Sequence, residues 1–170
     1  NRWIEHIFRV MDNKGKIMGL PTGILELDQT CHGLDDSQGE IVVIAGRPGQ
    51  GKTAMACSLV YHMSVMHDIP GLVFSAEMTQ DQLYSRIILG AAGIDTSKAM
   101  TGMFSRNDEL VMQPMAEKVK RAPLEISDGG HISTADIRSQ VQVAKRKHGI
   151  RYIMVDHLHL IKAVSKRGLK

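Results

Sequence analysis

The sequence predicts an α/β fold in which a parallel sheet carries helices on both faces. Two observations indicate this class. Short apolar runs of strand length alternate along the chain with segments whose apolar residues recur at helical spacing. The chain also has 170 residues, of which 43% are hydrophobic, so it can bury a real core and is not disordered. Such alternation is typical of right-handed strand–helix–strand units, whose strands run parallel.

The composition excludes several classes of protein. The 21 basic and 18 acidic residues give a net charge of +3, which is too small for a dedicated nucleic-acid binder. Aromatic residues make up only 4%, which argues against a platform that stacks single-stranded bases. The apolar runs are far shorter than a membrane span, and the N-terminus lacks a signal-peptide pattern. Without a secretory signal, Cys31 and Cys57 are expected to be free thiols in a reducing cytoplasm.

The first third of the chain contains three predicted elements. An apolar stripe at helical spacing predicts a short helix within residues 1–14; its members are Trp3, Ile4, Ile7, Phe8 and Met11. The β-branched run Ile41–Ala45 predicts a strand that is buried on both faces. A helix is expected from Lys52, with an inward face formed by Ala56, Leu59, Val60, Met63 and Met66.

The remaining elements alternate regularly. Strands are expected at Gly71–Ser75, Pro123–Ser127 and Tyr152–Asp156. Helices are expected after the capping residues Thr79, with Gln82, and Ser133, with Asp136, and Gly149 should end the second of them. Residues 94–121 are expected to be mostly helical, with four methionines as core residues: Met100, Met103, Met112 and Met115.

The segment before the helix at Lys52 fits the pattern G-x-x-x-x-G-K-[ST]. Its residues are Gly46, Arg47, Pro48, Gly49, Gln50, Gly51, Lys52 and Thr53. Glycines let the backbone point its N–H groups at a phosphate, and the helix directs its positive end to the same place. Lys52 is expected to contact the β- and γ-phosphates of ATP, and the Thr53 hydroxyl a Mg²⁺ ion. The alternative is a glycine-rich turn without a ligand.

Two acidic residues follow strands that should end beside this loop. Asp156 ends the last strand, where an acid that supports Mg²⁺ is expected. Its alternative role is that of a turn residue. Glu77 follows Gly71–Ser75 at the same sheet edge and is a candidate to activate the attacking water. Its alternative role is that of a first-turn acid beside a helix dipole.

Four ordered segments carry a resemblance to a known family. They are Pro21–Gly23 with Leu27–Asp28, Gly46–Pro48, Phe74–Met78 followed by Gln82, Leu83 and Arg86, and Val155–Ile161. Together they resemble the ATPase motor of DnaB-type replicative DNA helicases. The resemblance extends from about Ile17 to Ile161 and implies a RecA-like P-loop NTPase core.

The resemblance also implies roles and partners. Glu77 would be the catalytic base, and Lys52 would act in catalysis as well as in nucleotide binding. Thr53 and Asp156 would hold the metal. The whole protein would couple ATP hydrolysis to translocation on single-stranded DNA. It would self-associate into a ring, expected to be a hexamer, and its partners would be primase and a helicase loader. Residues 1–14 resemble the linker helix that docks on a neighbouring subunit, with packing on its own domain as the alternative; residues 15–170 would form an incomplete motor domain.

Some features depart from the family pattern. Tyr and Gln usually stand where His157 and His159 lie, and a metal pair of these histidines is disfavoured because no third ligand is evident. These departures fit a phage or prophage version of the family. The basic segment Lys145–Lys147 is expected to be a solvated helix end. The family's later strands, DNA-contacting loops and arginine finger have no counterpart before Lys170, so slow hydrolysis by this chain alone is expected.

Two other functions stay open at this point. One is a different RecA-like ATPase, RadA-like or KaiC-like, which the residues Arg47–Pro48 and Asp156–Ile161 disfavour. The other is a module that binds nucleotide without hydrolysing it. The expected location is the bacterial cytoplasm, or the host cytoplasm for a phage protein.

Overall fold

The computed structural model describes residues 17, 19–35, 39–129, 132–157 and 161. The chain divides into two compact units, the first ending at Ala45 and the second beginning at Gly46. The helix expected within residues 1–14 lies outside the described residues. Every residue predicted to bind nucleotide or metal belongs to the second unit.

The described part of the first unit contains helix α2, Leu25–Cys31, and the turn that leads into it. Asp28 is buried, and its Oδ1 accepts hydrogen bonds from the backbone N–H and the hydroxyl of Thr22 at 2.8 and 2.7 Å. Its Oδ2 accepts from the N–H of Gly23 at 3.0 Å. A buried carboxylate is stable only with such donors, so Asp28 fixes the turn before the helix.

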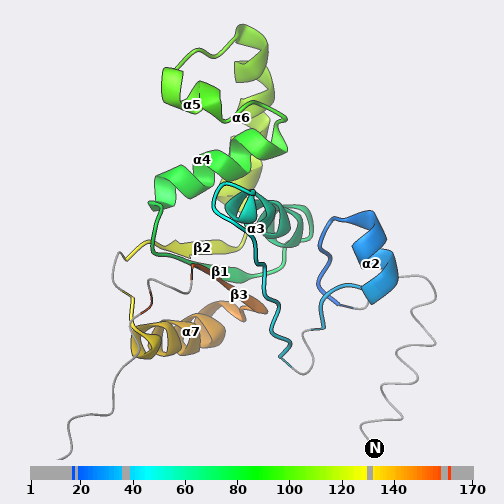
Figure 1. Cartoon of the computed structure of the whole chain (residues 1–170), viewed down its shortest axis with the longest axis vertical. Helices are drawn as coiled ribbons and strands as arrows, with labels where there is room; N and C mark the ends of the chain where they lie inside the picture. The colour runs from blue at the N-terminus through cyan, green and yellow to red at the C-terminus, as the bar shows by residue number, and fades with distance from the viewer. Residues whose placement is uncertain (1–16, 18, 36–38, 130–131, 158–160, 162–170) are drawn as a thin grey trace, which may run out of the picture. The chain divides into compact units, whose positions relative to one another are not determined.

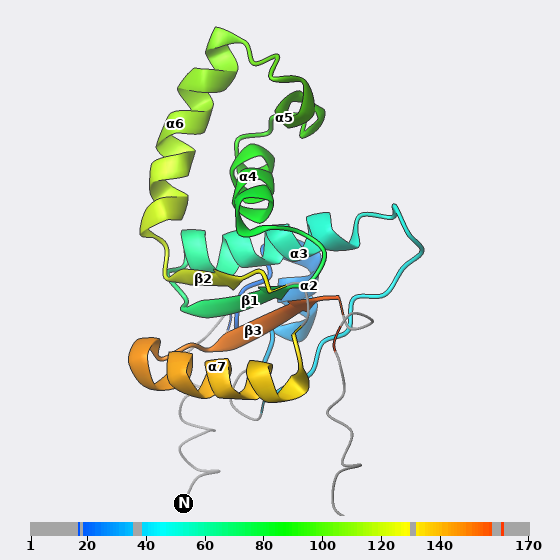
Figure 2. The same ribbon diagram turned by 90° about the vertical axis from the view of Figure 1, so that its left-hand side faces the viewer.

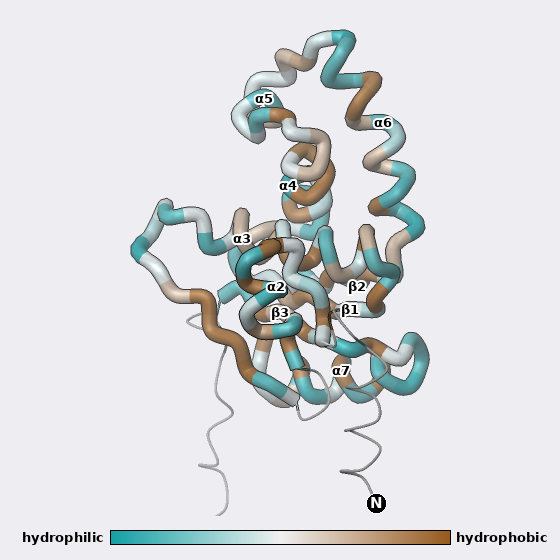
Figure 3. Tube along the Cα trace, turned by 90° about the vertical axis from the view of Figure 1, so that its right-hand side faces the viewer, coloured by the Kyte–Doolittle hydropathy of each residue, from teal (hydrophilic) through white to brown (hydrophobic). Residues whose placement is uncertain are grey.

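The run Ile41–Ala45 forms no strand, so this prediction is wrong. Its side chains are exposed, with Ile41 at 87% and Val43 at 72%. The run is a continuous hydrophobic stretch in Figure 3. β-branched residues favour extended backbone, but a strand also needs a hydrogen-bonded neighbour. The described sheet belongs to the second unit, whereas this run belongs to the first.

The second unit contains a parallel sheet of three strands in the order β2-β1-β3. The strands are β1 (Gly71–Ser75), β2 (Leu124–Ser127) and β3 (Tyr152–Asp156). The central strand β1 places Gly71 opposite Leu124 of β2 and opposite Tyr152 of β3. The three strands predicted after the phosphate loop are therefore confirmed, and their carboxyl ends share one edge.

Helices cover both faces of this sheet, as Figures 1 and 2 show. The covering helices are α3 (Lys52–Val60), the π-helix η1 (Tyr61–Met66), α4 (Gln80–Ala91), α6 (Arg106–Arg121) and α7 (Thr134–His148). The short helix α5 (Ser97–Thr101) has no buried residue and lies away from the sheet (Figure 2). On one face, residues of α3, η1, α4 and α6 pack around Val73 and Ile126. On the other face, α7 packs against Leu72 and Phe74. Alternate residues of β1 thus enter two different cores, which explains why all five of its residues are buried.

The ends of the helices follow the predicted capping residues. Thr79 and Gln82 form a reciprocal capping box at the start of α4, and Ser133 and Asp136 form another at the start of α7. Gly149 adopts the left-handed conformation, with φ of 63°, and ends α7. These signals depend on neighbours within one turn, so the sequence alone identifies them.

The prediction of core methionines is only partly right. Met100 and Met103 are 92% and 77% exposed, whereas Met112 and Met115 are half-buried. Met66 is also exposed, because the helix changes from α to π geometry before it and the 3.6-residue spacing no longer applies. Helical spacing identifies a face of a helix but not whether another element covers that face.

Both cysteines are free thiols; Cys31 is exposed and Cys57 is buried. Burial raises the pKa of the Cys57 thiol to about 11, so this thiol stays protonated at neutral pH. Within the part of the chain that the structure describes, no helix has the length and apolar character needed to span a bilayer.

Candidate functional site

The phosphate loop leads directly into α3. Gly49 and Gly51 have φ of 76° and 83°, a conformation that side chains rarely adopt, and Gly51 is the N-cap residue of α3. Lys52 is the first residue of the helix, and its Nζ donates a hydrogen bond to the carbonyl of Arg47 at 3.2 Å. The ammonium group therefore lies against the loop whose backbone N–H groups would hold a phosphate.

Thr53 and Asp156 lie side by side. The Thr53 hydroxyl donates a hydrogen bond to Oδ2 of Asp156 at 2.9 Å, although 103 residues separate them in sequence. Helix α3 supplies the hydroxyl and the end of β3 supplies the carboxylate. A hydroxyl and a carboxylate are oxygen ligands of the kind that Mg²⁺ prefers, so the donor set fits this metal.

Glu77 lies in a tight turn at the end of β1. The hydroxyl of Ser75 donates to the carbonyl of Met78 at 2.7 Å and accepts from the N–H of Met78 at 3.1 Å. The N–H of Ala76 donates to the carbonyl of Asp156 at 2.9 Å, so the pairing with β3 continues past the last strand residue. These bonds fix the backbone around Glu77 beside the end of β3.

Two further contacts lie at the carboxyl ends of the strands, and the sequence analysis missed both. Oδ2 of Asp128, which follows β2, accepts a hydrogen bond from the N–H of Gln80 in α4 at 2.8 Å. Nδ1 of His157, which follows β3, lies 3.2 Å from Oε2 of Glu77. Asp128 and His157 both directly follow predicted strands, at the edge where ligands of open parallel sheets bind. Their position in the sequence could therefore have marked them as candidate site residues.

The structure thus brings most of the predicted site residues close together. Thr53 is hydrogen-bonded to Asp156, and Glu77 follows the end of the adjacent strand β1. The structure also shows that Glu77 is not a first-turn helix acid, because α4 begins at Gln80 after the N-cap residue Thr79. His159 lies outside the described residues.

A glycine-rich loop that opens a helix, with two acids at the ends of adjacent parallel strands, defines the class of P-loop NTPases. Residues 19–169 match the family described as "DnaB-like helicase C terminal domain". The chain belongs to this family, as its resemblance suggested.

Curated relatives agree with this assignment. The chain is 31% identical over 173 residues to the replicative DNA helicase DnaB of Rickettsia prowazekii, covering 96% of this chain and 35% of the relative. It is 32% identical over 162 residues to DnaB of Haemophilus influenzae, covering 92% of this chain and 34% of the relative. The chain therefore spans about a third of the length of these relatives.

Solved structures confirm the RecA-like fold. One is described as an ATPase domain; it has a TM-score of 0.86 and 27% identity, over 99% of this chain and 60% of that chain. Another is a DnaB-like replicative helicase described together with its interactions with primase. It has a TM-score of 0.83 and 27% identity, over 98% of this chain and 40% of that chain.

Proposed function

We propose that this chain is the nucleotide-binding part of a replicative DNA helicase motor that hydrolyses ATP. The observation that carries the proposal is the hydrogen bond between Thr53 and Asp156, at 2.9 Å. It joins the phosphate loop to the end of β3, so the predicted phosphate and metal ligands form one site. A structural glycine-rich turn would not require a carboxylate at this point.

Different residues of the site are proposed to bind different parts of Mg·ATP. The backbone N–H groups of the loop, from every residue of Gly46–Gly51 except Pro48, and those at the start of α3 surround the phosphates. Lys52 adds a positive charge beside the β- and γ-phosphates. Thr53 and Asp156 hold the metal, which when bound neutralises charge on the phosphate oxygens. The left-handed glycines make this close approach of the backbone possible.

Glu77 is the residue that we assign to water activation. Its side chain is 62% exposed at the sheet edge, so a water molecule can reach it. It lies in the turn that follows β1, the strand next to the one that ends in Asp156, and the hydrogen bonds between Ser75 and Met78 fix its backbone. A carboxylate in this position can accept a proton from the water that attacks the γ-phosphate.

The whole protein is proposed to translocate along single-stranded DNA as a ring, expected to be a hexamer, in the bacterial or host cytoplasm. Primase and a helicase loader are its proposed partners. The family match supports this proposal, as does the relative described with its interactions with primase. Residues 1–14 are proposed as the linker helix and residues 15–170 as part of the motor domain.

Three variants test the separate roles of Glu77, Lys52 and Asp156. Glu77→Gln should keep Mg·ATP affinity and lower the rate of single-turnover hydrolysis by a factor of about 10² or more, as expected for a lost general base.

Lys52→Ala should abolish binding of a fluorescent ATP analogue without unfolding the protein, because Lys52 lies at a solvated loop. Asp156→Asn should weaken the Mg²⁺ dependence of binding.

Gln140→Ala, at an exposed position of α7 with no assigned role in the site, is the control. Unchanged affinity in Lys52→Ala would refute the nucleotide site. Unchanged turnover per bound ATP in Glu77→Gln would leave a module that binds nucleotide without using Glu77 as a base.

A further inference from the structure

We propose that His157 is a positioning residue, which holds the carboxylate of Glu77 in place for ATP hydrolysis. This inference rests on the proposed role of Glu77 as the base. The observation behind it is the distance of 3.2 Å between Nδ1 of His157 and Oε2 of Glu77.

The backbone of Glu77 is already fixed, but its side chain is not. Ser75 and Met78 close the turn through two hydrogen bonds, and Ala76 is bonded to the end of β3. The Glu77 side chain has several rotatable bonds and is 62% exposed, so packing leaves it considerable rotational freedom. An additional contact is needed to hold its carboxylate in one orientation.

His157 is well placed to provide this contact. It follows Asp156 directly, and Asp156 is held both by strand pairing with Ser75 and by the hydroxyl of Thr53. The His157 side chain is 37% exposed, so the contact lies at the rim of the site rather than in the core. Two consecutive residues at the end of β3 therefore orient the metal-binding hydroxyl of Thr53 and the carboxylate of Glu77.

The two oxygens of the Glu77 carboxylate can serve different purposes. The imidazole contacts Oε2 and holds the carboxylate in place, and Oε1 remains able to accept a proton from water. Catalytic groups must be held to about 0.5 Å, and small misplacements lower rates markedly. Loss of the imidazole should therefore slow the hydrolysis step and leave the affinity for Mg·ATP unchanged.

The test measures single-turnover ATP hydrolysis by the full chain, with protein in excess over ATP, and the dissociation constant of Mg·ATP. His157→Ala should lower the hydrolysis rate about tenfold with the dissociation constant within twofold of the wild-type value. His157→Asn should restore most of the rate, because its amide nitrogen can take the place of Nδ1. His148→Ala, at an exposed histidine of α7, is the matched control and should have no effect.

A double variant tests whether His157 acts through Glu77. His157→Ala should have no further effect in the Glu77→Gln background. An additive loss, a rate unchanged in His157→Ala, or no recovery in His157→Asn would overturn the positioning role while leaving Glu77 as the base. An unchanged rate in Glu77→Gln alone would overturn the proposed base itself, and the positioning role with it.

Discussion

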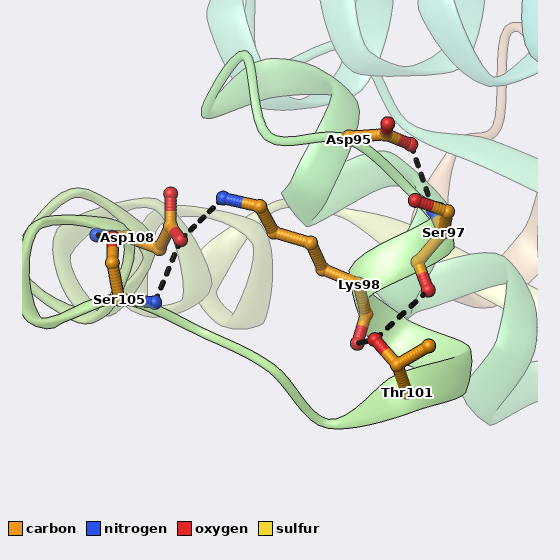
Figure 4. A network of polar contacts seen from close by, with 6 residues as sticks. All are labelled: Asp95, Ser97, Lys98, Thr101, Ser105 and Asp108. Carbon is orange, nitrogen blue, oxygen red and sulfur yellow. Dashed lines mark hydrogen bonds and ion pairs between the residues drawn. The ribbon is translucent and has the colours of Figure 1, made fainter.

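Lys98 and Asp108 connect the short helix α5 to the start of α6, as Figure 4 shows. Nζ of Lys98 lies 2.6 Å from Oδ2 of Asp108, and the same oxygen accepts the N–H of Ser105 at 2.8 Å. The hydrogen bond from Lys98, and after it those from Ser105, lower the pKa of Asp108 to about 2. Ser105 and Asp108 also form a third capping box, so one carboxylate serves both the helix start and the ion pair.

Lys98→Met should raise the pKa of Asp108 toward its ordinary value of 3.8 but not fully to it, because Ser105 still donates hydrogen bonds. The folded-state pKa is lower than the unfolded one, so this carboxylate stabilises the fold above about pH 4. The contribution is lost as the pH falls toward 2. A carbon-detected NMR titration of the carboxyl groups measures the change.

Asp136 is the control for this titration, because its pKa is lowered by hydrogen bonds from Ser133 in a different helix. It should titrate identically in the wild type and in Lys98→Met. A pKa of Asp108 that stays at about 2 in the variant would show that the cap, not the ion pair, dominates.

At the scale of elements, two glycines illustrate how strongly context decides a substitution. Gly71 begins β1 opposite Tyr152, and a Cβ built on Gly71 would clash with the tyrosine ring. The ring is held in turn, because the Tyr152 hydroxyl lies 2.6 Å from the buried hydroxyl of Ser64. Gly90 lies inside α4, where an added Cβ would meet nothing within 4 Å.

Gly71→Ala should therefore lower the free energy of unfolding by about 1–3 kcal/mol, as expected for overpacking. Gly90→Ala should raise it by about 0.4–1 kcal/mol, because alanine is less flexible than glycine in the unfolded chain and favours helix. Urea unfolding followed by circular dichroism measures both. Equal effects of the two substitutions would contradict the close contact between Gly71 and the Tyr152 ring.

At the scale of the whole molecule, none of the described arginines is assigned to the transferred γ-phosphate; Arg47 lies in the phosphate loop, where its carbonyl accepts a hydrogen bond from Lys52. Lys52, Thr53, Glu77 and Asp156 are the residues proposed to act on Mg·ATP. In related chemistry, an arginine supplied by a neighbouring subunit raises the rate by about 10³–10⁵. The curated relatives are about three times as long as this chain, which covers 35% of one of them.

Because none of the described arginines is assigned to the γ-phosphate, this chain alone should bind ATP and hydrolyse it very slowly. Because none of the described residues is assigned to DNA, single-stranded DNA should not stimulate the hydrolysis. Steady-state ATPase assays with and without DNA, beside sedimentation velocity, test the expectation, and Lys52→Ala gives the background rate. Strong DNA-stimulated turnover by a stable hexamer would contradict it. One of this chain's own arginines would then have to act on a neighbour, with Arg106, Arg121 and Arg138 as the first candidates.

The local features of this molecule could be predicted from the sequence. The phosphate loop, the two predicted capping boxes and the three strands β1, β2 and β3 all depend on residues close together along the chain. The order of those motifs also led to the family. Glu77 and Asp156 were predicted as site residues because the ends of parallel strands meet at one edge, and this rule needs only the strand positions.

The tertiary structure decided which apolar segments are buried and which side chains meet. Ile41–Ala45 has the composition of a core strand yet is exposed, and Met100 and Met103 have helical spacing yet face solvent. The contact between His157 and Glu77 likewise depends on how two strands pair. Burial and long-range contacts are properties of pairs of elements, whereas a sequence pattern describes each element by itself.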